Sequence, residues 1–317
     1  MIEAYEDTFW YFLQRYSIIL RTILANVTYS IAIKFMLPSA RSPITLSPQD
    51  WSIQVDESSG CYLLVPLVPP AKNHTNDFPT LAWFDVSYWQ SQDKISGTNH
   101  GRGITYFIQH ATLHMVLRRY LRGGLIAKFI AQTFVFTGLT RTRVYQEIAL
   151  LEYMRTCHLP VPRPIAGKIS RHLGLFYRNQ LLIERIPNAQ DLHAYLLQQP
   201  LAVEVWTELG RIIARMHLAG VDHHDLNIEN ILLDQQGKLW LIDFDKCGGF
   251  NPETWPVANI ARLARSIRKK QTIHSTYHVS ADSLCRLLSG YTETLRNENP
   301  DTLTKIENEL NTIFSCK

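Results

Sequence analysis

The stretch HHDLNIEN, residues 223–230, places His223, His224 and Asp225, followed by the amides Asn227 and Asn230, directly before the strand-like run ILLD. A polar cluster beside a buried strand is often a functional site, although a helix end followed by a turn gives a similar pattern. A second stretch, LWLIDFD at residues 239–245, carries Asp243, which lies 18 positions after Asp225 (243 − 225). The spacing of these two stretches decides between the two interpretations.

Between the two stretches the sequence predicts a β-hairpin, with ILLD and LWLID as strands and QQGK as the turn. A tight hairpin brings both strand ends to one edge, so Asn230 and Asp243 are expected to converge, with Asp225 opposite. Carboxylate and amide oxygens, together with phosphate oxygens, are the ligands that Mg²⁺ takes in proteins. Phosphoryl transfer needs such a metal ion and an aspartate that accepts the proton of the attacking hydroxyl.

Length and composition fit a globular protein. The chain has 317 residues, 46% hydrophobic and 19% charged, which predicts one large or two modest domains. A net charge of +4 suits a phosphate-bearing or anionic-surface partner and is too small to indicate nucleic acid. The five cysteines are scattered without a CxxC pair, which argues against a disulfide framework and a zinc site and favours a reducing cytoplasm.

The N-terminal segment needs a separate interpretation. Residues 1–37 read as helical, and the apolar-rich part, 15–37, is interrupted by Arg21 and Lys34, so that it is too short to span a bilayer. The acidic opening is also a poor match to a cleavable signal peptide. A helix on a membrane surface and a helix buried against the domain remain equally open. Residues 38–56, rich in proline and serine, are expected to be a linker or an extended segment.

The rest of the chain predicts an α+β fold with two lobes. The first lobe is predicted from strands at 60–68, 115–120 and 175–186, and from a glycine-punctuated turn that leads into a β-like run at 97–109. It also contains one amphipathic helix at 141–159 with Val144, Ile148, Leu151 and Met154 on one face. The second lobe is predicted from helices at 191–199 and 203–220, the hairpin, and a mostly helical tail at 256–317. Gly220 is expected to end the helix that precedes HHDLNIEN.

The two polar stretches resemble two motifs of the protein-kinase superfamily. HHDLNIEN is similar to the catalytic loop H-R-D-L-x-x-x-N, and LIDFD is similar to the metal-binding D-F-G. This resemblance implies that Asp225 is the catalytic aspartate, that Asn230 and Asp243 hold Mg²⁺, and that ATP is the phosphoryl donor. Both motifs in order, joined by a hairpin, form a specific signal.

The resemblance extends to four other positions. Gly101 and Gly103 in GTNHGRGITYF would belong to the glycine-rich loop, and an ordinary turn is the alternative. Glu147 would pair with the cation that holds the ATP phosphates, unless it is a solvated helix charge. Glu184 and Ile186, at the end of LLIERI, would supply hinge backbone near adenine, where the alternative is an ordinary buried strand.

Three positions depart from the kinase pattern. Arg118 stands where lysine is expected; arginine could still hold phosphate and pair with Glu147, and Lys128 is a possible substitute. Asp245 replaces the glycine of D-F-G and adds a carboxylate. His224 replaces the arginine of H-R-D, which suggests activity without an activating phosphate, while His223 is expected to support the loop through hydrogen bonds. The chain has no A-P-E segment, so a platform for protein substrates is not visible.

Over residues 81–250 the chain resembles the 3-deoxy-D-manno-octulosonic acid (Kdo) kinase family of Gram-negative bacteria. The resemblance is carried by VLRRYLRGG, LPVPRP, HHDLNIENILLD and LWLIDFDKC. It implies an ATP-dependent phosphotransferase that acts on a hydroxyl of the Kdo residue of a lipid A precursor in lipopolysaccharide biosynthesis. It also implies a peripheral location at the cytoplasmic face of the inner membrane. The expected division is an N-terminal extension at 1–60, an N-lobe at 61–186 and a C-lobe at 187–317.

Two basic clusters could bind nucleotide phosphates, the acidic substrate or an anionic membrane, and solvated helix faces are the alternative. Their members are Arg118, Arg119, Arg122, Arg262, Arg265, Arg268, Lys269 and Lys270. Three other functions stay open at this point: a kinase of the same fold that acts on a core heptose or on protein, a nucleotide-binding pseudokinase, and a membrane-associated adaptor without enzymatic activity.

Overall fold

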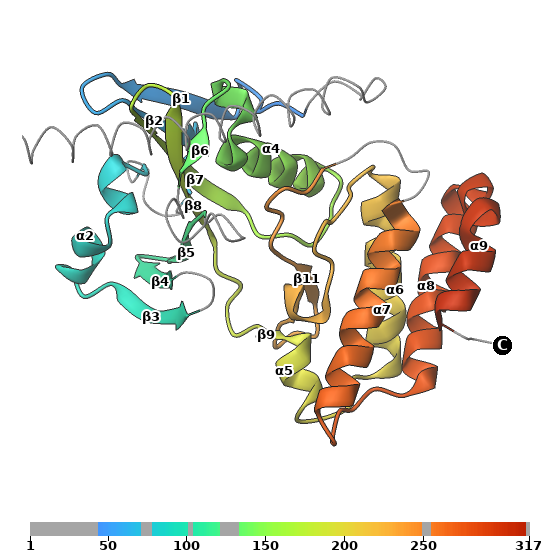
Figure 1. Cartoon of the computed structure of the whole chain (residues 1–317). Helices are drawn as coiled ribbons and strands as arrows, with labels where there is room; N and C mark the ends of the chain where they lie inside the picture. Colours follow the sequence, from blue (N-terminus) through green and yellow to red (C-terminus); the bar gives the residue numbers. More distant parts are fainter. Residues whose placement is uncertain (1–43, 71–77, 101–103, 121–132, 249–254, 315–317) are drawn as a thin grey trace, which may run out of the picture. The chain divides into compact units, whose positions relative to one another are not determined.

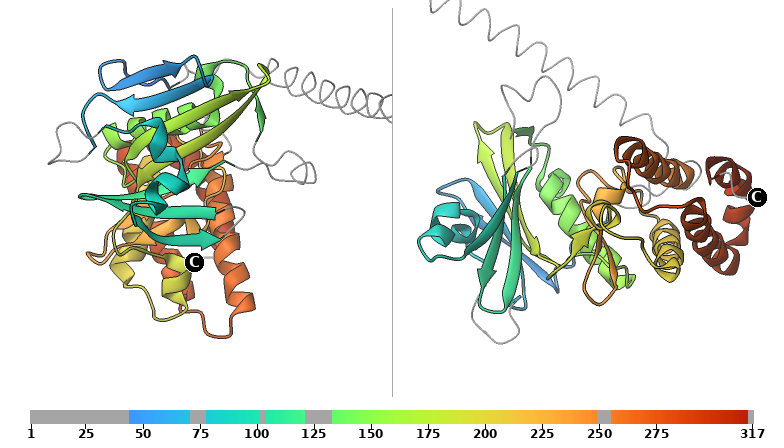
Figure 2. Two further views of the ribbon diagram at one scale, coloured as in Figure 1. Left: turned by 90° about the vertical axis from the view of Figure 1, so that its left-hand side faces the viewer. Right: turned by 90° about the horizontal axis from the view of Figure 1, so that it is seen from below.

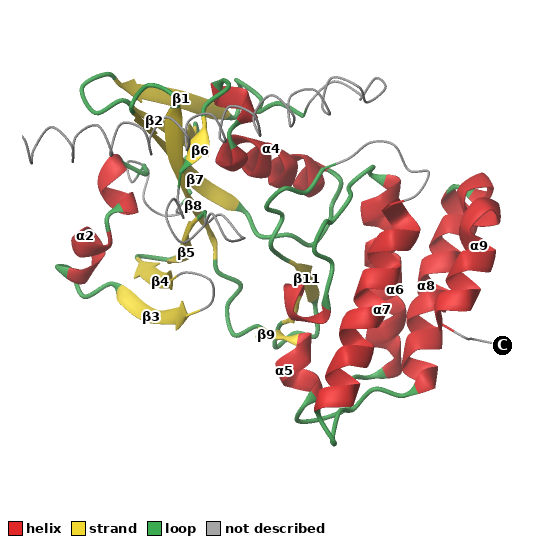
Figure 3. Cartoon of the chain, in the orientation of Figure 1, coloured by secondary structure: helices red, strands yellow, loops and turns green. Residues whose placement is uncertain are grey.

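The computed structural model describes residues 44–70, 78–100, 104–120, 133–248 and 255–314 (Figure 1). The helix predicted at 1–37 and the candidate residues Gly101, Gly103, Arg122 and Lys128 lie outside these ranges. The described part is mixed α and β, with an antiparallel sheet in its N-terminal part and mostly helices in its C-terminal part (Figure 3). This is the α+β class that the sequence predicted.

The large sheet has the order β1-β2-β7-β8-β5-β4-β3, all pairs antiparallel, and β6 pairs with β8 beside this path. Its strands are β1 (Trp51–Asp56), β2 (Cys61–Pro66), β3 (Ile95–His100), β4 (Ile104–His110), β5 (Leu113–Arg119), β6 (Phe134–Val135), β7 (Pro164–His172) and β8 (Phe176–Glu184). The predicted strands at 60–68, 115–120 and 175–186 correspond to β2, β5 and β8. The stretch predicted at 97–109 divides between β3 and β4.

β7 and β1 are among the strands that were not predicted. β7 begins at Pro164, the last residue of PVPRP, and contains Gly167, and both features weaken a strand signal in sequence. Gly167 is needed because a Cβ there would lie 2.6 Å from Cδ1 of Ile148, so this strand packs closely against the helix. β1 falls within residues that the sequence assigned to an N-terminal extension, yet it pairs with β2 from Trp51↔Pro66 to Asp56↔Cys61.

Helix α4 (Arg143–Thr156) lies along one face of the sheet (Figure 1; Figure 2). The four residues predicted to share its buried face, Val144, Ile148, Leu151 and Met154, are all at most 2% exposed. This confirms the helical period of the sequence. The other face of the sheet is covered by η1 (Leu81–Phe84) and α2 (Val86–Gln90), whose Trp83, Phe84 and Trp89 are buried with strand residues.

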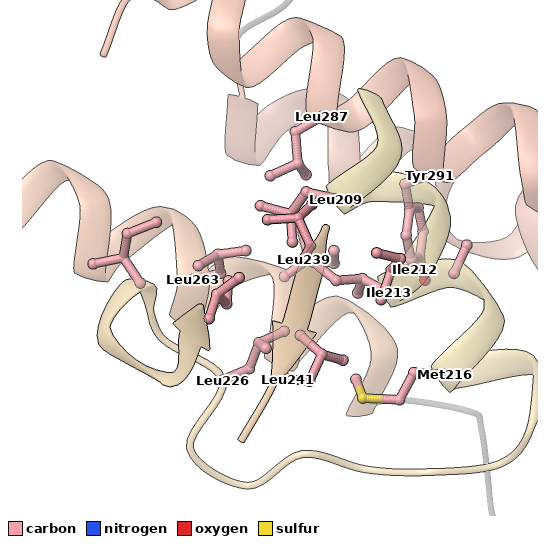
Figure 4. Close-up of a cluster of buried hydrophobic side chains, with 14 of the residues drawn as sticks. Leu209, Ile212, Ile213, Met216, Leu226, Leu239, Leu241, Leu263, Leu287 and Tyr291 are labelled. Carbon is pink, nitrogen blue, oxygen red and sulfur yellow. The ribbon is translucent and has the colours of Figure 1, made fainter. Parts of the chain in front are cut away.

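The C-terminal part combines a small sheet, of order β11-β10-β9, with helices. Its elements are β9 (Gln190–Asp191), α5 (Leu192–Leu196), α6 (Val203–Leu218), η3 (Ile228–Asn230), β10 (Ile231–Leu233), β11 (Leu239–Leu241), α7 (Trp255–Ile273), α8 (Ala281–Glu298) and α9 (Pro300–Phe314). The predicted hairpin and the helical tail are confirmed. A shared apolar core of α6, α7, α8 and both hairpin strands holds these elements together (Figure 4).

Two glycines allow α6 and α8 to approach each other closely. A Cβ on Gly210 would overlap the carbonyl oxygen of Leu287 and lie 2.7 Å from the backbone nitrogen of Tyr291, and one on Gly290 would overlap the carbonyl oxygen of Thr207. The close contact fixes α6, and α6 leads directly into HHDLNIEN.

Cysteine pairing departs from the prediction at one position. Cys61, Cys157 and Cys247 are free thiols, whereas Cys285 of α8 takes part in a disulfide bond. Among the described helices, none has a run long and apolar enough to cross a membrane.

Candidate active site

The loop after α6 carries the first polar stretch. α6 ends at Leu218, and Gly220 follows with φ +75°, the left-handed conformation expected of a helix-ending glycine. Leu226 in the loop and Leu241 in β11 are both 0% exposed and anchor the two polar stretches in the same apolar core (Figure 4). The polar side chains next to these anchors are therefore held on a fixed backbone.

His223 is buried and serves as a support for the loop. Its Nδ1 accepts a hydrogen bond from the backbone N–H of Asp225 at 3.3 Å, so Nε2 carries the proton and donates to the carbonyl oxygen of Ile242 at 3.0 Å. Burial lowers the pKa of His223, which keeps the ring neutral. The ring also packs on Phe244, with 4.7 Å between ring centroids. His223 thus supports the loop through hydrogen bonds, as the sequence predicted, and its bond to Ile242 also joins the loop to the second polar stretch.

Asp225 presents its carboxylate to solvent, while its backbone is held by two amides. Nδ2 of Asn227 and Nδ2 of Asn230 donate to the carbonyl oxygen of Asp225 at 3.0 and 2.9 Å. Arg262 of α7 approaches the carboxylate, with 3.8 Å between Nη1 and Oδ1. The carboxylate is therefore accessible to solvent, and the positive charge of Arg262 lies close to it.

The hairpin brings Asn230 next to the segment that carries Asp243. β10 and β11 pair from Ile231↔Leu241 to Leu233↔Leu239, and the backbone N–H of Ile242 donates to the carbonyl oxygen of Asn230 at 3.0 Å. Asp243 has φ +66°, a left-handed conformation that non-glycine residues adopt uncommonly and that is concentrated at functional sites. Asn230 is therefore bonded both to the backbone of Asp225 and to Ile242, the neighbour of Asp243.

Arg118, in the position where the kinase pattern has lysine, lies between two carboxylates. On β5 its Nη2 pairs with Oε1 of Glu147 and its Nη1 pairs with Oδ1 of Asp243. Tyr120 donates from its hydroxyl to Oε2 of Glu147 at 2.5 Å. The side chain of Glu147 is only 3% exposed, which excludes a solvated helix charge.

The charges of this network support each other. Burial raises the pKa of Glu147, and Arg118 together with the hydroxyl of Tyr120 opposes this rise. Burial lowers the pKa of Arg118, but Glu147, Tyr120 and Asp243 outweigh it, so the pKa of the guanidinium stands well above its ordinary value. Arg118 is therefore a permanent cation that links β5, α4 and the loop that carries Asp243.

Asp245, which replaces the glycine of D-F-G, forms an ion pair with a second arginine, Arg143. Nη1 of Arg143 lies 3.0 Å from Oδ2 of Asp245, and the guanidinium stacks over the ring of Phe134 at 4.4 Å. Arg143 is the first residue of α4, so two ion pairs, through Arg118 and Arg143, join this helix to residues 243–245. These ion pairs hold the helix against residues 243–245.

The predicted hinge residues lie at the end of β8. Glu184 pairs with Met115 across the sheet, and its backbone N–H donates to the carbonyl oxygen of Arg163 at 2.8 Å. Ile186 is buried, with 7% of its surface exposed. Glu184 is the last residue of β8 and Ile186 follows on the segment that leads into the C-terminal part, but the N–H of Glu184 already donates to Arg163.

Several basic residues of α7 make contacts with the described chain. Lys270 pairs with Glu229 at 2.7 Å, and Arg268 donates to the carbonyl oxygen of Ile313. Since Arg262 also lies near Asp225, the basic residues at 262–270 form only in part a solvated helix face.

Three polar residues of the site were missed by sequence reasoning. Asn259 on α7 accepts from the backbone N–H of His223 at 2.9 Å and donates to Oδ1 of Asp222 at 2.8 Å. Asp222 also bonds Nδ1 of His224 at 3.0 Å, and this bond raises the pKa of His224. Tyr120 is the third. Asp222 adjoins the motif, so its position was a usable signal, whereas no local pattern marks Asn259.

No group of three or more His, Cys, Asp and Glu side chains arranged to hold a metal ion is present in the described ranges. Asn230 and Asp243, the predicted ligands, form a smaller set of one amide and one carboxylate. Both are oxygen donors of the type that Mg²⁺ uses when phosphate and water supply its remaining ligands.

A model of the family described as "Lipopolysaccharide kinase (Kdo/WaaP) family" matches residues 86–291, about two thirds of the chain. This chain belongs to that family. The matched range includes Arg118, Glu147, Asp225 and Asp243, so the geometry described above lies within it. The resemblance drawn from the sequence motifs is confirmed.

Curated relatives carry a consistent name. A 3-deoxy-D-manno-octulosonic acid kinase of Photobacterium profundum is 46% identical over 210 residues, which are 66% of this chain and 88% of the relative. Proteins with the same name from Vibrio cholerae and Haemophilus influenzae are 42% and 44% identical over 208 and 195 residues, covering 62% and 59% of this chain and 88% and 81% of the relatives.

Solved structures are similar at lower identity. WaaP in complex with acyl carrier protein is 14% identical with a TM-score of 0.44, and the match covers 71% of this chain and 92% of that one. A glucosamine kinase is also 14% identical with a TM-score of 0.47, and the match covers 86% of each chain.

Proposed function

We propose that this protein transfers the γ-phosphoryl group of ATP to a hydroxyl of the Kdo residue of a lipid A precursor, a step of lipopolysaccharide core biosynthesis. One observation carries the proposal: within a chain that belongs to a lipopolysaccharide kinase family, the side-chain amide of Asn230 donates to the carbonyl oxygen of Asp225, and the carbonyl oxygen of Asn230 accepts from Ile242, the neighbour of Asp243. The names of the curated relatives support the sugar acid as the acceptor.

Asp225 is proposed as the residue that accepts the proton of the attacking hydroxyl. Its carboxylate is exposed, while Asn227, Asn230 and His223 hold its backbone. Such an arrangement leaves the carboxylate free to meet an acceptor and gives it a fixed position. Positioning of this kind, with charge stabilisation, supplies most of the catalysis in phosphoryl transfer. Arg262, close to Asp225, is placed to attract the carboxylate or phosphates of the acceptor.

Asn230 and Asp243 are proposed to hold Mg²⁺. Since Nδ2 of Asn230 bonds to Asp225, Oδ1 is the atom of this amide that suits a metal ion. When bound, the metal ion would neutralise charge on the ATP phosphates. Arg118 adds a fixed positive charge beside Asp243, and we propose that it takes the role of the kinase lysine. Glu147 and Tyr120 hold it in place.

Nucleotide binding is proposed to use further backbone positions. The adenine would lie near the backbone of Glu184 and Ile186, and Gly101 and Gly103, which connect β3 to β4, would approach the phosphates. The proposed lobes then divide at residues 186 and 187. A peripheral location at the cytoplasmic face of the inner membrane, with contact to anionic lipid, fits a lipid acceptor.

The test uses two variants that separate turnover from nucleotide binding. Asp225→Asn should lower the rate of phosphate transfer at least about 10³-fold and leave the affinity for Mg·ATP within about twofold. Asp243→Asn should weaken both transfer and Mg·ATP binding. Glu309→Gln, an exposed carboxylate on α9, is the matched control. Normal transfer by the Asp225→Asn protein would overturn the assignment of the catalytic residue.

A further inference from the structure

The turn between β7 and β8 exposes two leucines. Leu173 is 76% exposed and Leu175 is 68% exposed, and only Gly174 stands between them. Single exposed apolar residues are common on protein surfaces, but two at the tip of a hairpin form a projecting apolar feature. Such a feature requires a partner or a specific reason.

Turn chemistry does not explain the leucine at position 173. Leu173 has φ +50° and Gly174 has φ +69°, so both occupy the left-handed region. Glycine, asparagine and aspartate favour such positions, whereas a leucine there is strained and gains no burial. Leu173 is therefore unfavourable in two ways, because its backbone conformation is strained and its apolar side chain is exposed to water. Such a combination is typical of functional surfaces.

The leucines continue into a larger apolar rim at this end of the sheet. The backbone N–H of Phe136 donates to the carbonyl oxygen of Leu175 at 2.8 Å, and the ring of Phe136 stacks on Tyr62 with 6.2 Å between centroids. Tyr62 pairs in register with Val55, which is 56% exposed. We call Val55, Tyr62, Phe136, Leu173 and Leu175 the apolar rim.

The hairpin that carries the leucines is basic. Residues 168–178, KISRHLGLFYR, contain two arginines, one lysine and one histidine and no acidic residue. Arg171 donates from Nη2 to the carbonyl oxygen of Gly174 at 2.7 Å, and its guanidinium lies over the ring of Phe136 at 4.8 Å, so a cation is fixed directly beneath the turn. Arg178 is exposed on β8.

Two acidic residues lie in the neighbouring turn between β1 and β2. The backbone N–H of Arg171 donates to the carbonyl oxygen of Gly60, which places this turn beside β7. Asp56 is held by the hydroxyls of Ser58 and Ser59 at 2.6 Å each, and Glu57 is exposed. They reduce but do not reverse the positive charge around the leucines.

The turn lies at the end of β8 away from Glu184, the proposed hinge. Near the turn, the hydroxyl of Tyr177 accepts from the backbone N–H of Arg143 at 3.3 Å, and Arg143 pairs with Asp245 at 3.0 Å. Two contacts therefore connect this end of β8 to the loop of Asp243.

We propose that the apolar rim is a membrane-docking surface, and that Leu173 and Leu175 insert into the interface of a bilayer that contains anionic phospholipid. Apolar side chains at a projecting tip supply the insertion, and Arg171, His172 and Arg178 face the lipid headgroups. The meaning of this surface for the enzyme rests on the proposed function, because docking would bring the active site to an acceptor that lies in the membrane.

The test measures sedimentation of the full-length protein with vesicles and does not depend on activity. Vesicles of phosphatidylcholine alone are compared with vesicles that also contain phosphatidylglycerol. The variant Leu173→Asn/Leu175→Gln should bind the anionic vesicles at least about tenfold more weakly than the unaltered protein. Asparagine suits the left-handed conformation at 173, so this variant should keep the melting temperature, which is measured in parallel.

Two matched controls separate the turn from general surface chemistry. Ile273→Gln removes an apolar side chain that is 60% exposed at the end of α7, and it should leave vesicle binding unchanged. Arg178→Gln should weaken binding about fivefold for anionic vesicles only, while Arg286→Gln on α8 should not.

Failure of the docking proposal has its own signature. Equal vesicle binding by the unaltered protein and the leucine variant would overturn it, as would no binding by either protein. A change in elution volume of the variant, with vesicle binding unchanged, would show that the rim contacts another protein surface and would also overturn it. Phosphate transfer to an acceptor dispersed in detergent should be normal in the leucine variant. If neither the unaltered protein nor any variant transferred phosphate, the result would count against the proposed function and not against the docking surface.

Discussion

Arg118→Ala is the substitution that examines the charge network most deeply. Arg118 pairs with Glu147 and Asp243, and the side chain of Glu147 is only 3% exposed. Removing the guanidinium leaves a buried carboxylate with Tyr120 as its remaining hydrogen-bond partner among those described here. Breaking a buried ion pair from one side costs about 3–5 kcal/mol, because the other charge stays buried without compensation.

The loss of folding stability in the Arg118→Ala variant should depend on pH and should be larger at higher pH. Burial already raises the pKa of Glu147 from its ordinary value of 4.5, and Arg118 opposes this rise. Without Arg118 the pKa rises further, and a carboxyl with a raised pKa loses stability as pH rises through the range between its unfolded and folded values. The variant should therefore be about 3 kcal/mol less stable than the unaltered protein near pH 7.5 and only about 1 kcal/mol less stable near pH 4.5.

The assay is urea unfolding followed by circular dichroism at both pH values. Arg286→Ala is the matched control, because Arg286 pairs with Asp282 at the surface with 53% and 61% of the two side chains exposed. Exposed pairs contribute about 0–1 kcal/mol, so this control should change little. A loss below about 1 kcal/mol for Arg118→Ala at both pH values would refute the account of the network.

Gly210→Ala should lower the free energy of unfolding by about 3 kcal/mol or prevent folding, because the added Cβ overlaps the Leu287 carbonyl; Ser289→Ala on exposed α8 surface is the control for urea unfolding. A double-mutant cycle with Arg143→Gln and Asp245→Asn should give a coupling energy of about 1 kcal/mol, and additive losses would disprove the ion pair. Burial lowers the pKa of His217 from 6.5 to about 3, so its share of stability is present above pH 6.5 and is lost as pH falls. Stability should therefore drop by about 2 kcal/mol from near pH 8 to near pH 5, and His217→Gln should remove that part of the drop.

The local parts of the fold and site could be predicted from sequence because they depend on short spacings. The helical period of Val144, Ile148 and Met154 predicted α4, and the short turn between two apolar runs predicted the hairpin of β10 and β11. Since a hairpin fixes where its two ends lie, the convergence of Asn230 and Asp243 followed from that turn. The support role of His223 followed from its place beside Asp225.

The parts that depend on distant pairing could not be predicted. β7 carries a proline and a glycine, and only its partners β2 and β8 and the close packing of α4 make it a strand. Arg143 and Asp245 are 102 residues apart, and no local pattern links them. Asn259 supports His223 from a helix whose apolar period says nothing about polar contacts at its surface.

The most direct test of the central claim is transfer of radiolabelled phosphate from Mg·ATP to defined lipids. The acceptors are a lipid A precursor with one Kdo residue, the same lipid without Kdo, a heptose-bearing core and casein, each with the unaltered and the Asp225→Asn protein. The account predicts label on the Kdo lipid alone, lost with Asp225→Asn. Label on the heptose core or casein instead would contradict the proposed acceptor, and no label on any acceptor while ATP still binds would contradict the proposed activity.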